Sequence, residues 1–339
     1  MRKEKIGVLL INLGTPDSPA TKDVRKYLRQ FLMDGRVIDI PAIPRYLLVN
    51  GIIAPFRAPK SAKEYRKLWV ERGSPLKFYG HDVCDALQQS IGDDYKVVLG
   101  MRYQSPSIES ALNELKEANV SRMIVISLFP QYASASTGSA VQEVNDVVNK
   151  WQIIPSINYI NQFMDHPKFI EAFAANGLKL MAKTDYDHVV FSYHGLPERH
   201  IRKGSVGKQC QLGSCCDHFH EKNRYCYRAQ CFYTSRLLAE KLGLSKEQYT
   251  VTFQSRLGKD PWVKPYTDEV LAELPKQGKK KVLAYSPAFV ADCLETTVEV
   301  GGQFKEEFEE AGGEVWDLVP SLNDSEIWIE CLKDLVEKA

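Results

Sequence analysis

The sequence lacks the features that mark membrane-spanning, secreted and nucleic-acid-binding chains. No apolar run approaches the roughly 20 residues that a spanning helix needs, and residues 1–5 lead into a strand without a signal-peptide pattern. The net charge is only +1 over 339 residues, which gives no indication of nucleic-acid binding. We therefore expect a cytoplasmic protein that contacts membranes at most peripherally, whose oligomeric state the sequence leaves unknown.

Glycine-rich phosphate-binding loops are also missing. The loop after the first apolar run, residues 14–19, is not G-x-G-x-x-G, so a dinucleotide site is not supported. The composition, 44% hydrophobic and 26% charged, is that of an ordinary globular chain. Its length suits two domains with a core each.

Cysteine is present in moderate number but is unevenly placed. Five of the eight cysteines fall within residues 205–231: Cys210, Cys215, Cys216, Cys226 and Cys231. In a cytosolic chain such a cluster indicates metal binding more often than disulfides. The surrounding stretch is too polar to fold alone, so a bound metal would supply its ordering energy. Zinc, with His218 or His220 helping, and a patch of free thiols are both compatible with these residues.

Apolar runs alternate with loops and helical patterns along the whole chain, which predicts an α/β fold with doubly wound parallel sheets. Strands are expected at residues 5–12, 95–100, 123–129, 188–193, 249–254, 281–286 and 314–319. The loop L-G-T-P from Leu13 has a counterpart in H-G-L-P from His194, and the loop from Arg102 to Pro106 loosely resembles that from Arg256 to Pro261. We expect two similar Rossmann-like domains that face each other across a cleft holding the site.

The domain boundary is expected near residue 163. The first domain, residues 1–163, includes an unusual segment at 41–60 with many apolar residues, four prolines and two arginines. This segment is either irregular chain packed on the core or an apolar lip over a hydrophobic ligand. The second domain, residues 164–339, contains the cysteine-rich insert at 205–231 and a C-terminal helix at 325–337.

His194 ends an apolar strand that Gly195 and Pro197 interrupt. Open α/β sheets bind their ligands at the carboxyl ends of strands, which makes His194 a candidate functional residue. A histidine satisfied by a backbone carbonyl at a turn is an equally ordinary interpretation.

A second candidate stretch follows the apolar residues 282–285. It reads as a strand-to-helix turn whose helix carries Asp292, Glu295 and Glu299. Spacings of three and four residues would place all three carboxylates on one helical face. A solvated acidic face is the usual meaning of such a run, but carboxylates beside a buried imidazole would form a proton relay or a metal site.

Several motifs resemble those of ferrochelatases, the terminal enzymes of haem synthesis. They include I-N-L-G-T-P (11–16), G-S-P-L-K (73–77), P-Q-Y-A-S-A-S-T-G (130–138), S-Y-H-G-L-P (192–197), T-F-Q-S-R-L-G-K-D-P-W (252–262) and A-F-V-A-D-C-L-E-T (288–296). In this order and spacing they cover nearly the whole chain. The resemblance implies a chelatase-type fold and a lyase that inserts Fe²⁺ into a porphyrin.

The resemblance also implies roles for individual residues. His194 and Glu295 become the active-site pair, as ligands of the substrate Fe²⁺ or in proton transfer, with Glu299 and Asp292 extending the acidic track. Segment 41–60 becomes the lip over the porphyrin, and Arg57 the residue that contacts its propionates. The remaining expected porphyrin contacts are Leu13, Arg102, Tyr103, Tyr132, Trp262 and Phe289.

Leu13 and the cysteines refine this expectation. Ferrochelatases that act on coproporphyrin resemble one another in having Tyr before the first-loop glycine, so Leu13 favours protoporphyrin IX and protohaem. Coproporphyrin III or cobalt as substrate, or a haem or metal carrier without turnover, are the alternatives. Some bacterial ferrochelatases carry a 2Fe–2S cluster on a similar insert, which implies four of the five clustered cysteines as ligands; zinc remains the competing reading.

Overall fold

A computed structural model of the chain describes residues 4–256, 258 and 260–339, with the backbone alone for Lys208. Leu257 and Lys259, which belong to the 252–262 motif, lie outside the described residues, as do residues 1–3. Contacts group the chain into two units. The first comprises Met1–Phe129, Ser134–Gln162 and Ile329–Ala339; the second comprises Pro130–Ala133 and Phe163–Trp328.

The first unit contains a parallel sheet with strand order β2-β1-β3-β4, formed by β1 (Ile6–Gly14), β2 (Tyr95–Tyr103), β3 (Arg122–Ser127) and β4 (Ser156–Ile160). β1 is central and almost wholly buried, as its continuous apolar sequence predicts. β4 was not anticipated, because this edge strand is half-exposed and lacks a continuous apolar run. Its helices are α1 (Thr21–Leu32), α2 (Ala42–Leu47), α3 (Ala54–Leu68), α4 (Pro75–Ile91), α5 (Ile108–Glu117) and α6 (Ser139–Val148).

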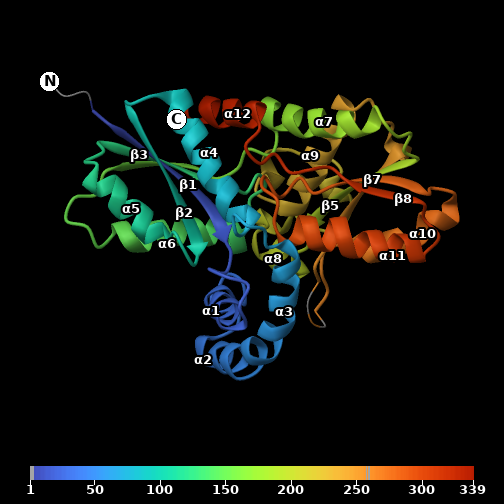
Figure 1. The fold of residues 1–339 in the computed structure, drawn as a ribbon, viewed down its shortest axis with the longest axis horizontal. Coiled ribbons are helices and arrows are strands. Elements are labelled where there is room, and N and C mark those ends of the chain that lie inside the picture. Colours follow the sequence, from blue (N-terminus) through green and yellow to red (C-terminus); the bar gives the residue numbers. More distant parts are fainter. Residues whose placement is uncertain (1–3, 257, 259) are drawn as a thin grey trace. The chain divides into compact units, whose positions relative to one another are not determined.

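The second unit repeats this topology with strand order β6-β5-β7-β8, again all parallel. Its strands are β5 (His188–His194), β6 (Tyr249–Gln254), β7 (Lys281–Tyr285) and β8 (Val315–Leu318). Its helices are α7 (Pro167–Met181), α8 (Glu198–Lys203), α9 (Tyr227–Lys241), α10 (Thr267–Glu273) and α11 (Phe304–Glu310), and α12 (Glu326–Glu337) ends the chain. The expected pair of doubly wound α/β sheets is therefore confirmed (Figure 1).

The chain end differs from the expected division. The sequence reading placed the whole C-terminal helix in the second domain, whereas the contacts assign residues from Ile329 onward to the first unit. Two side chains of that unit account for this: Arg122 Nη1 and Asn158 Nδ2 each donate to the carbonyl of Ala339 at 3.3 Å.

Each sheet is stabilised by an apolar layer between strands and helices. In the first unit Leu9 and Ile11 of β1 pack with the apolar faces of α5 and α6. In the second unit Val282 and Trp316 pack with Phe304 and Phe308 of α11. Each fully buried aliphatic or aromatic side chain contributes about 1.5–3 kcal/mol, so these layers hold the strand ends in place.

Segment 41–60 is helical, so the irregular interpretation is wrong. It comprises α2, a π-helical turn at Leu48–Ile53 and the start of α3. Pro41 precedes α2 and Pro55 lies in the first turn of α3, where a missing N–H costs little. Figure 1 shows α1, α2 and α3 grouped at the carboxyl ends of β1 and β2. The segment exposes large apolar side chains, with Phe56 79% exposed, together with Ile43, Tyr46, Leu47 and Ile52.

Among the described residues, no helix combines the length and the apolar character needed to cross a bilayer.

His188 starts β5 at the end opposite to His194. Its side chain is only 2% exposed, and its Nε2 lies 2.8 Å from Thr250 Oγ1. Its Nδ1 is buried without a hydrogen-bond partner in the part of the chain that the structure describes. Burial, aided by the charge of Lys279, lowers the pKa of His188 from 6.5 to about 4.

This lowered pKa predicts acid sensitivity. The unfolded chain takes up a proton below about pH 6.5 while the folded chain does not, so stability is complete above that pH and falls as the pH approaches 4. The loss is on the order of 2 kcal/mol. Replacing His188 by Gln should flatten the dependence, measured as the difference in Tm between pH 7 and pH 5. An equal acid shift in both proteins would contradict the assignment.

Candidate active site

His194 lies at the carboxyl end of β5, the strand that pairs with both β6 and β7. The backbone turns directly after it, where the N–H of Gly195 donates to the carbonyl of Gln254 at 2.8 Å. A Cβ at position 195 would lie 2.8 Å from that oxygen and 3.2 Å from the Trp262 ring. Glycine is required here by this close approach, which fixes where the imidazole begins.

The imidazole of His194 has a defined orientation. Its Nδ1 lies 2.7 Å from the carbonyl oxygen of Gly195. Because a carbonyl can only accept, Nδ1 carries the proton, and Nε2 keeps the lone pair that a base or a metal ligand needs. The hydroxyl of Tyr227, from α9, donates to the carbonyl of His194 at 2.8 Å. Both interpretations of His194 are therefore compatible, because the backbone carbonyl satisfies the hydrogen-bonding capacity of Nδ1 alone.

Glu295 and Glu299 lie on a π-helix, Leu294–Gln303, that follows β7. The wide turn of a π-helix, with hydrogen bonds five residues apart, keeps residues separated by four positions on one face, and such turns are frequent at functional sites. The expected acidic face therefore exists for these two carboxylates.

Asp292 does not belong to this face, and its placement there is corrected. It precedes the helix, and its carboxylate accepts from the Ser321 N–H at 3.2 Å and from Asn323 Nδ2 at 2.8 Å. Its own N–H donates to Asn323 Oδ1 at 2.9 Å. Asp292 thus ties two loops together instead of extending the acidic track.

Glu299 is the carboxylate with the most elaborate surroundings. Ser255 Oγ lies 2.8 and 2.7 Å from its two oxygens, and Gln254 Nε2 lies 3.5 Å from Oε2. Burial raises the pKa of Glu299; the Ser255 bond and the charge of His194 oppose this, whereas the charge of Glu295 adds to it, and the pKa stays above its ordinary value. The imidazole and the two carboxylates thus influence one another.

Sequence reasoning missed Gln254 and Ser255. Both lie at the carboxyl end of β6, and a row of buried groups behind them fixes the amide of Gln254. Ser192 Oγ donates to Gln254 Oε1 at 2.5 Å, so Nε2 is the atom that faces Glu299. The signal that could have found them is the Gln-Ser pair within the 252–262 motif. This pair ends β6, the strand next to the one that ends at His194.

Three expected porphyrin contacts also lie in the second unit. Trp262 bridges to Pro197 and contacts the Gly195 turn. The Tyr132 N–H donates to Gln230 Oε1 at 2.6 Å, and its ring meets Tyr225 edge-on at 6.0 Å. Tyr132, Trp262 and Phe289 are each half-buried, so part of every ring remains open to a ligand, and their roles as walls stay predictions.

The other expected contacts lie in the first unit. Leu13 is half-buried near the end of β1, and Arg57 is exposed on α3. Arg102 binds Asp34 at 3.0 Å and Glu143 at 3.1 Å, and it donates to Ser139 Oγ at 2.7 Å.

Tyr103 is 0% exposed and donates to Asp34 Oδ2 at 2.9 Å, so its ring forms no wall in this structure. Burial alone would raise the pKa of Asp34, but hydrogen bonds from Ser139 and the Arg36 backbone, together with Arg102, bring it below the ordinary value. Asp34 therefore remains a carboxylate that anchors both Arg102 and Tyr103.

The clustered cysteines lie in one neighbourhood, mostly as pairs. Cys215 and Cys216 Sγ are 3.9 Å apart. A hydrogen bond from the Cys216 thiol is the main cause that lowers the pKa of Cys226. Cys231 is fully buried in α9, where its thiol and the Tyr227 hydroxyl are hydrogen-bonded to each other.

A preformed ligand shell is not seen: within the described residues, no three His, Cys, Asp or Glu side chains are grouped to hold one metal ion. His220 is engaged in capping a turn, since its Nδ1 accepts from the Lys222 N–H at 3.2 Å. Cys210, Cys216 and Cys226 influence one another's ionisation, and burial is the main cause that raises the pKa of the Cys210 thiol.

Known proteins resemble this chain over nearly its whole length. Residues 5–339 match the ferrochelatase family model. A ferrochelatase of Legionella pneumophila (strain Paris) is 49% identical over 332 residues, covering 98% of each chain. One of Coxiella burnetii (strain Dugway 5J108-111) is 45% identical over 340 residues, covering 99% of this chain and 94% of that protein.

Among solved structures, SirB from Bacillus subtilis with Fe³⁺ shares the fold, with a TM-score of 0.56 at 11% identity over 98% of this chain and 95% of that one. The matches with the two named ferrochelatases extend over nearly the full chain. The chain therefore belongs to the ferrochelatase family, the lyases that insert ferrous iron into a porphyrin in haem biosynthesis.

Proposed function

We propose that this chain inserts Fe²⁺ into protoporphyrin IX to form protohaem, with His194, Glu295 and Glu299 carrying the chemistry. The observation that supports this most is that the Nδ1 bond to Gly195 leaves the lone pair on Nε2 of His194, whose charge acts on Glu299, as that of Glu295 does. Two pyrrole protons must leave before iron can bind. A neutral imidazole accepts protons near neutral pH, and both imidazole and carboxylate are ligands of Fe²⁺.

Glu299 suits the second role, that of receiving protons from the imidazole. Its raised pKa brings it closer to that of a histidine, which eases transfer between them. Ser255 donates to both of its oxygens and thereby holds the carboxylate in one orientation. Glu295, four residues earlier on the same helix, remains the partner of His194 in binding iron or moving protons.

Replacing Glu295 by Gln removes a charge while nearly preserving shape. We expect iron insertion to fall roughly 10²–10⁴-fold, the range found when a positioned acid–base group is lost. Asp292→Asn is the matched control, because Asp292 only ties two loops; it should lower Tm but keep most turnover. The measurement is anaerobic Fe²⁺ insertion followed by absorbance. Full activity of the Glu295 variant would move the role to another residue.

The same assay separates the alternative functions. Purified protein, anaerobic Fe²⁺ and protoporphyrin IX should give many turnovers; one equivalent bound without further reaction supports a carrier instead. Parallel reactions with coproporphyrin III and with Co²⁺ test the substrate. Leu13 supports protoporphyrin IX, because ferrochelatases that act on coproporphyrin resemble one another in having Tyr at this position. Faster reaction with coproporphyrin III would overturn the choice of protoporphyrin IX as substrate.

We also propose that Cys210, Cys226, Cys231 and one of Cys215 and Cys216 hold a 2Fe–2S cluster. The mutual influence of these thiols on ionisation supports a common site, and four thiolates suffice for such a cluster. Its chemistry when bound would be one-electron transfer or, as we favour, structural support for the insert. One bound zinc is the alternative.

Exposed apolar side chains bear on where the protein is located. We propose a cytoplasmic protein that touches membranes at most peripherally, through the exposed apolar side chains of segment 41–60, among them Ile43, Ile52 and Phe56. Release from membranes by salt, without detergent, is the expected behaviour.

A further inference from the structure

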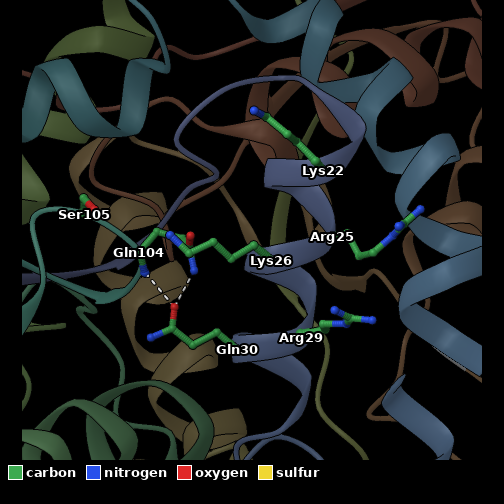
Figure 2. Close-up of a pocket in the computed structure, with 7 residues that line it drawn as sticks. All are labelled: Lys22, Arg25, Lys26, Arg29, Gln30, Gln104 and Ser105. Carbon is green, nitrogen blue, oxygen red and sulfur yellow. Dashed lines mark hydrogen bonds between the residues drawn. The ribbon is translucent and has the colours of Figure 1, made fainter. Parts of the chain in front are cut away.

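Helix α1 forms one wall of a cavity of about 530 Å³ in the first unit, outside the residues assigned above to iron insertion. Its seven lining side chains are all polar or charged: Lys22, Arg25, Lys26, Arg29, Gln30, Gln104 and Ser105. In Figure 2 Lys26 and Gln30 extend toward Gln104, whereas Arg25 and Arg29 extend from the other side of the same helix, away from Gln104. The volume is that of a small-molecule site.

The four cations carry a cost that nothing within the unit offsets fully. Lys22 and Lys26, and likewise Arg25 and Arg29, are four residues apart, where like charges destabilise a helix by a few tenths of a kcal/mol per pair. Lys22, Arg25 and Lys26 also lie in the N-terminal half of α1, the end at which a helix dipole disfavours cations. Asp17 accepts from Lys26 at 3.5 Å. Within the part of the chain that the structure describes, Lys22, Arg25 and Arg29 form no ion pair.

Two buried polar atoms beside the cations lack partners in the described chain. Gln104 is 6% exposed; its backbone N–H and its Nε2 both donate to Gln30 Oε1, at 2.9 and 2.5 Å, which leaves its own Oε1 without a donor. Arg25 Nε is likewise buried without an acceptor. Buried polar groups are normally satisfied, and leaving one unpaired costs about 1–3 kcal/mol.

We propose that this cavity binds a phosphate ester that carries neighbouring hydroxyl groups. Arg and Lys side chains pair with phosphate oxygens. A phosphate dianion has no proton to donate, so Gln104 Oε1 requires a hydroxyl from the alcohol part of the ester. The lining contains no aromatic or aliphatic side chain to receive a porphyrin. A free sugar phosphate and the headgroup of a phosphoglycerol lipid share this chemistry.

Calorimetry on the full chain tests the site at low salt and pH 8, with fructose 1,6-bisphosphate as the soluble probe and phosphatidylglycerol vesicles as the lipid probe. We expect one saturable site for at least one probe, weakened at least tenfold in Arg25→Gln/Arg29→Gln. The control Lys276→Gln/Lys305→Gln removes the same charge from α11 and the turn after α10 and should change affinity less than twofold. Equal weakening by both double variants, or no saturable binding to either probe, would overturn the proposal.

The hydroxyl requirement has its own test. Gln104→Met removes the unpaired acceptor, whereas Gln30→Met breaks the same Gln30–Gln104 bond but leaves that acceptor in place. Fructose 1,6-bisphosphate should lose several-fold more affinity in the first variant than in the second. Sulfate, which carries no proton to donate at pH 8, should respond equally to both. An equal response of both probes to both variants would remove Gln104 from the site and refute a hydroxyl-bearing ligand.

Discussion

His194→Ala is expected to abolish iron insertion, by roughly 10²–10⁴-fold or to below detection. The variant removes the Nε2 lone pair but leaves the Gly195 turn, whose position depends on the backbone bond to Gln254. Fold and porphyrin binding should therefore persist. Initial rates of anaerobic Fe²⁺ insertion, together with porphyrin titration by fluorescence, measure the two effects separately.

His188→Gln is the matched control for this variant. Both histidines lie on β5, but His188 is at the opposite end and is buried against Thr250. At pH 7.5 the control should insert iron at nearly the normal rate. Near-normal turnover of the His194 variant would remove it from the chemistry, whereas equal loss in both variants would indicate damage to the strand.

Replacing Cys226 by Ser should remove the colour that we expect of the protein purified without oxygen. Intact protein should be reddish-brown, with about two irons and two acid-labile sulfides per chain, as a 2Fe–2S cluster requires. The variant should also melt at lower temperature, since the insert loses the ordering energy of its ligand. Iron, sulfide and zinc analyses with visible absorbance provide the measurement.

Comparison of Cys215→Ser with Cys216→Ser sharpens this test. Cys216 is buried and hydrogen-bonded to Cys226, whereas Cys215 is half-exposed. We therefore expect the Cys216 variant to bleach and the Cys215 variant to keep most of its colour. Colourless protein with one tightly held zinc and no labile sulfide would replace the cluster by zinc, without affecting the family assignment.

The strands and the strand-end histidine could be predicted because their signals are local. Apolar runs identify β1 and β5, and glycine with proline marks where β5 ends. The half-exposed β4 lacks that signal. Prolines in segment 41–60 suggested irregular chain, although Pro41 only precedes α2 and α3 continues through Pro59.

The acidic site was predictable only in part, since its geometry depends on pairing across strands. A regular helix was assumed for Asp292, Glu295 and Glu299, whereas the π-helix begins after Asp292. Gln254 reaches Glu299 because β6 lies beside β5 in a register that a sequence does not display.

The similarity of the two halves of the chain could be predicted from the sequence, but the residues that match in the loops after β2 and β6 could not. The Met101 N–H donates to the Pro106 carbonyl at 2.6 Å, and the Phe253 N–H donates to that of Pro265 at 2.8 Å. The loop after β6 therefore matches the loop after β2 at Pro265, and the matching of Pro106 with Pro261 is corrected. The larger loop after β6 hid this equivalence.

The hydroxyl of Tyr227 has a consequence for how cysteine variants behave. This group braces the carbonyl of His194 and also contacts Cys231, one helical turn further along α9. Cys226 immediately precedes that helix. Disturbing the insert should therefore shift the hydroxyl that holds the backbone of His194. Slower iron insertion in a cysteine variant is then expected from this displacement alone, without any electron passing between insert and porphyrin.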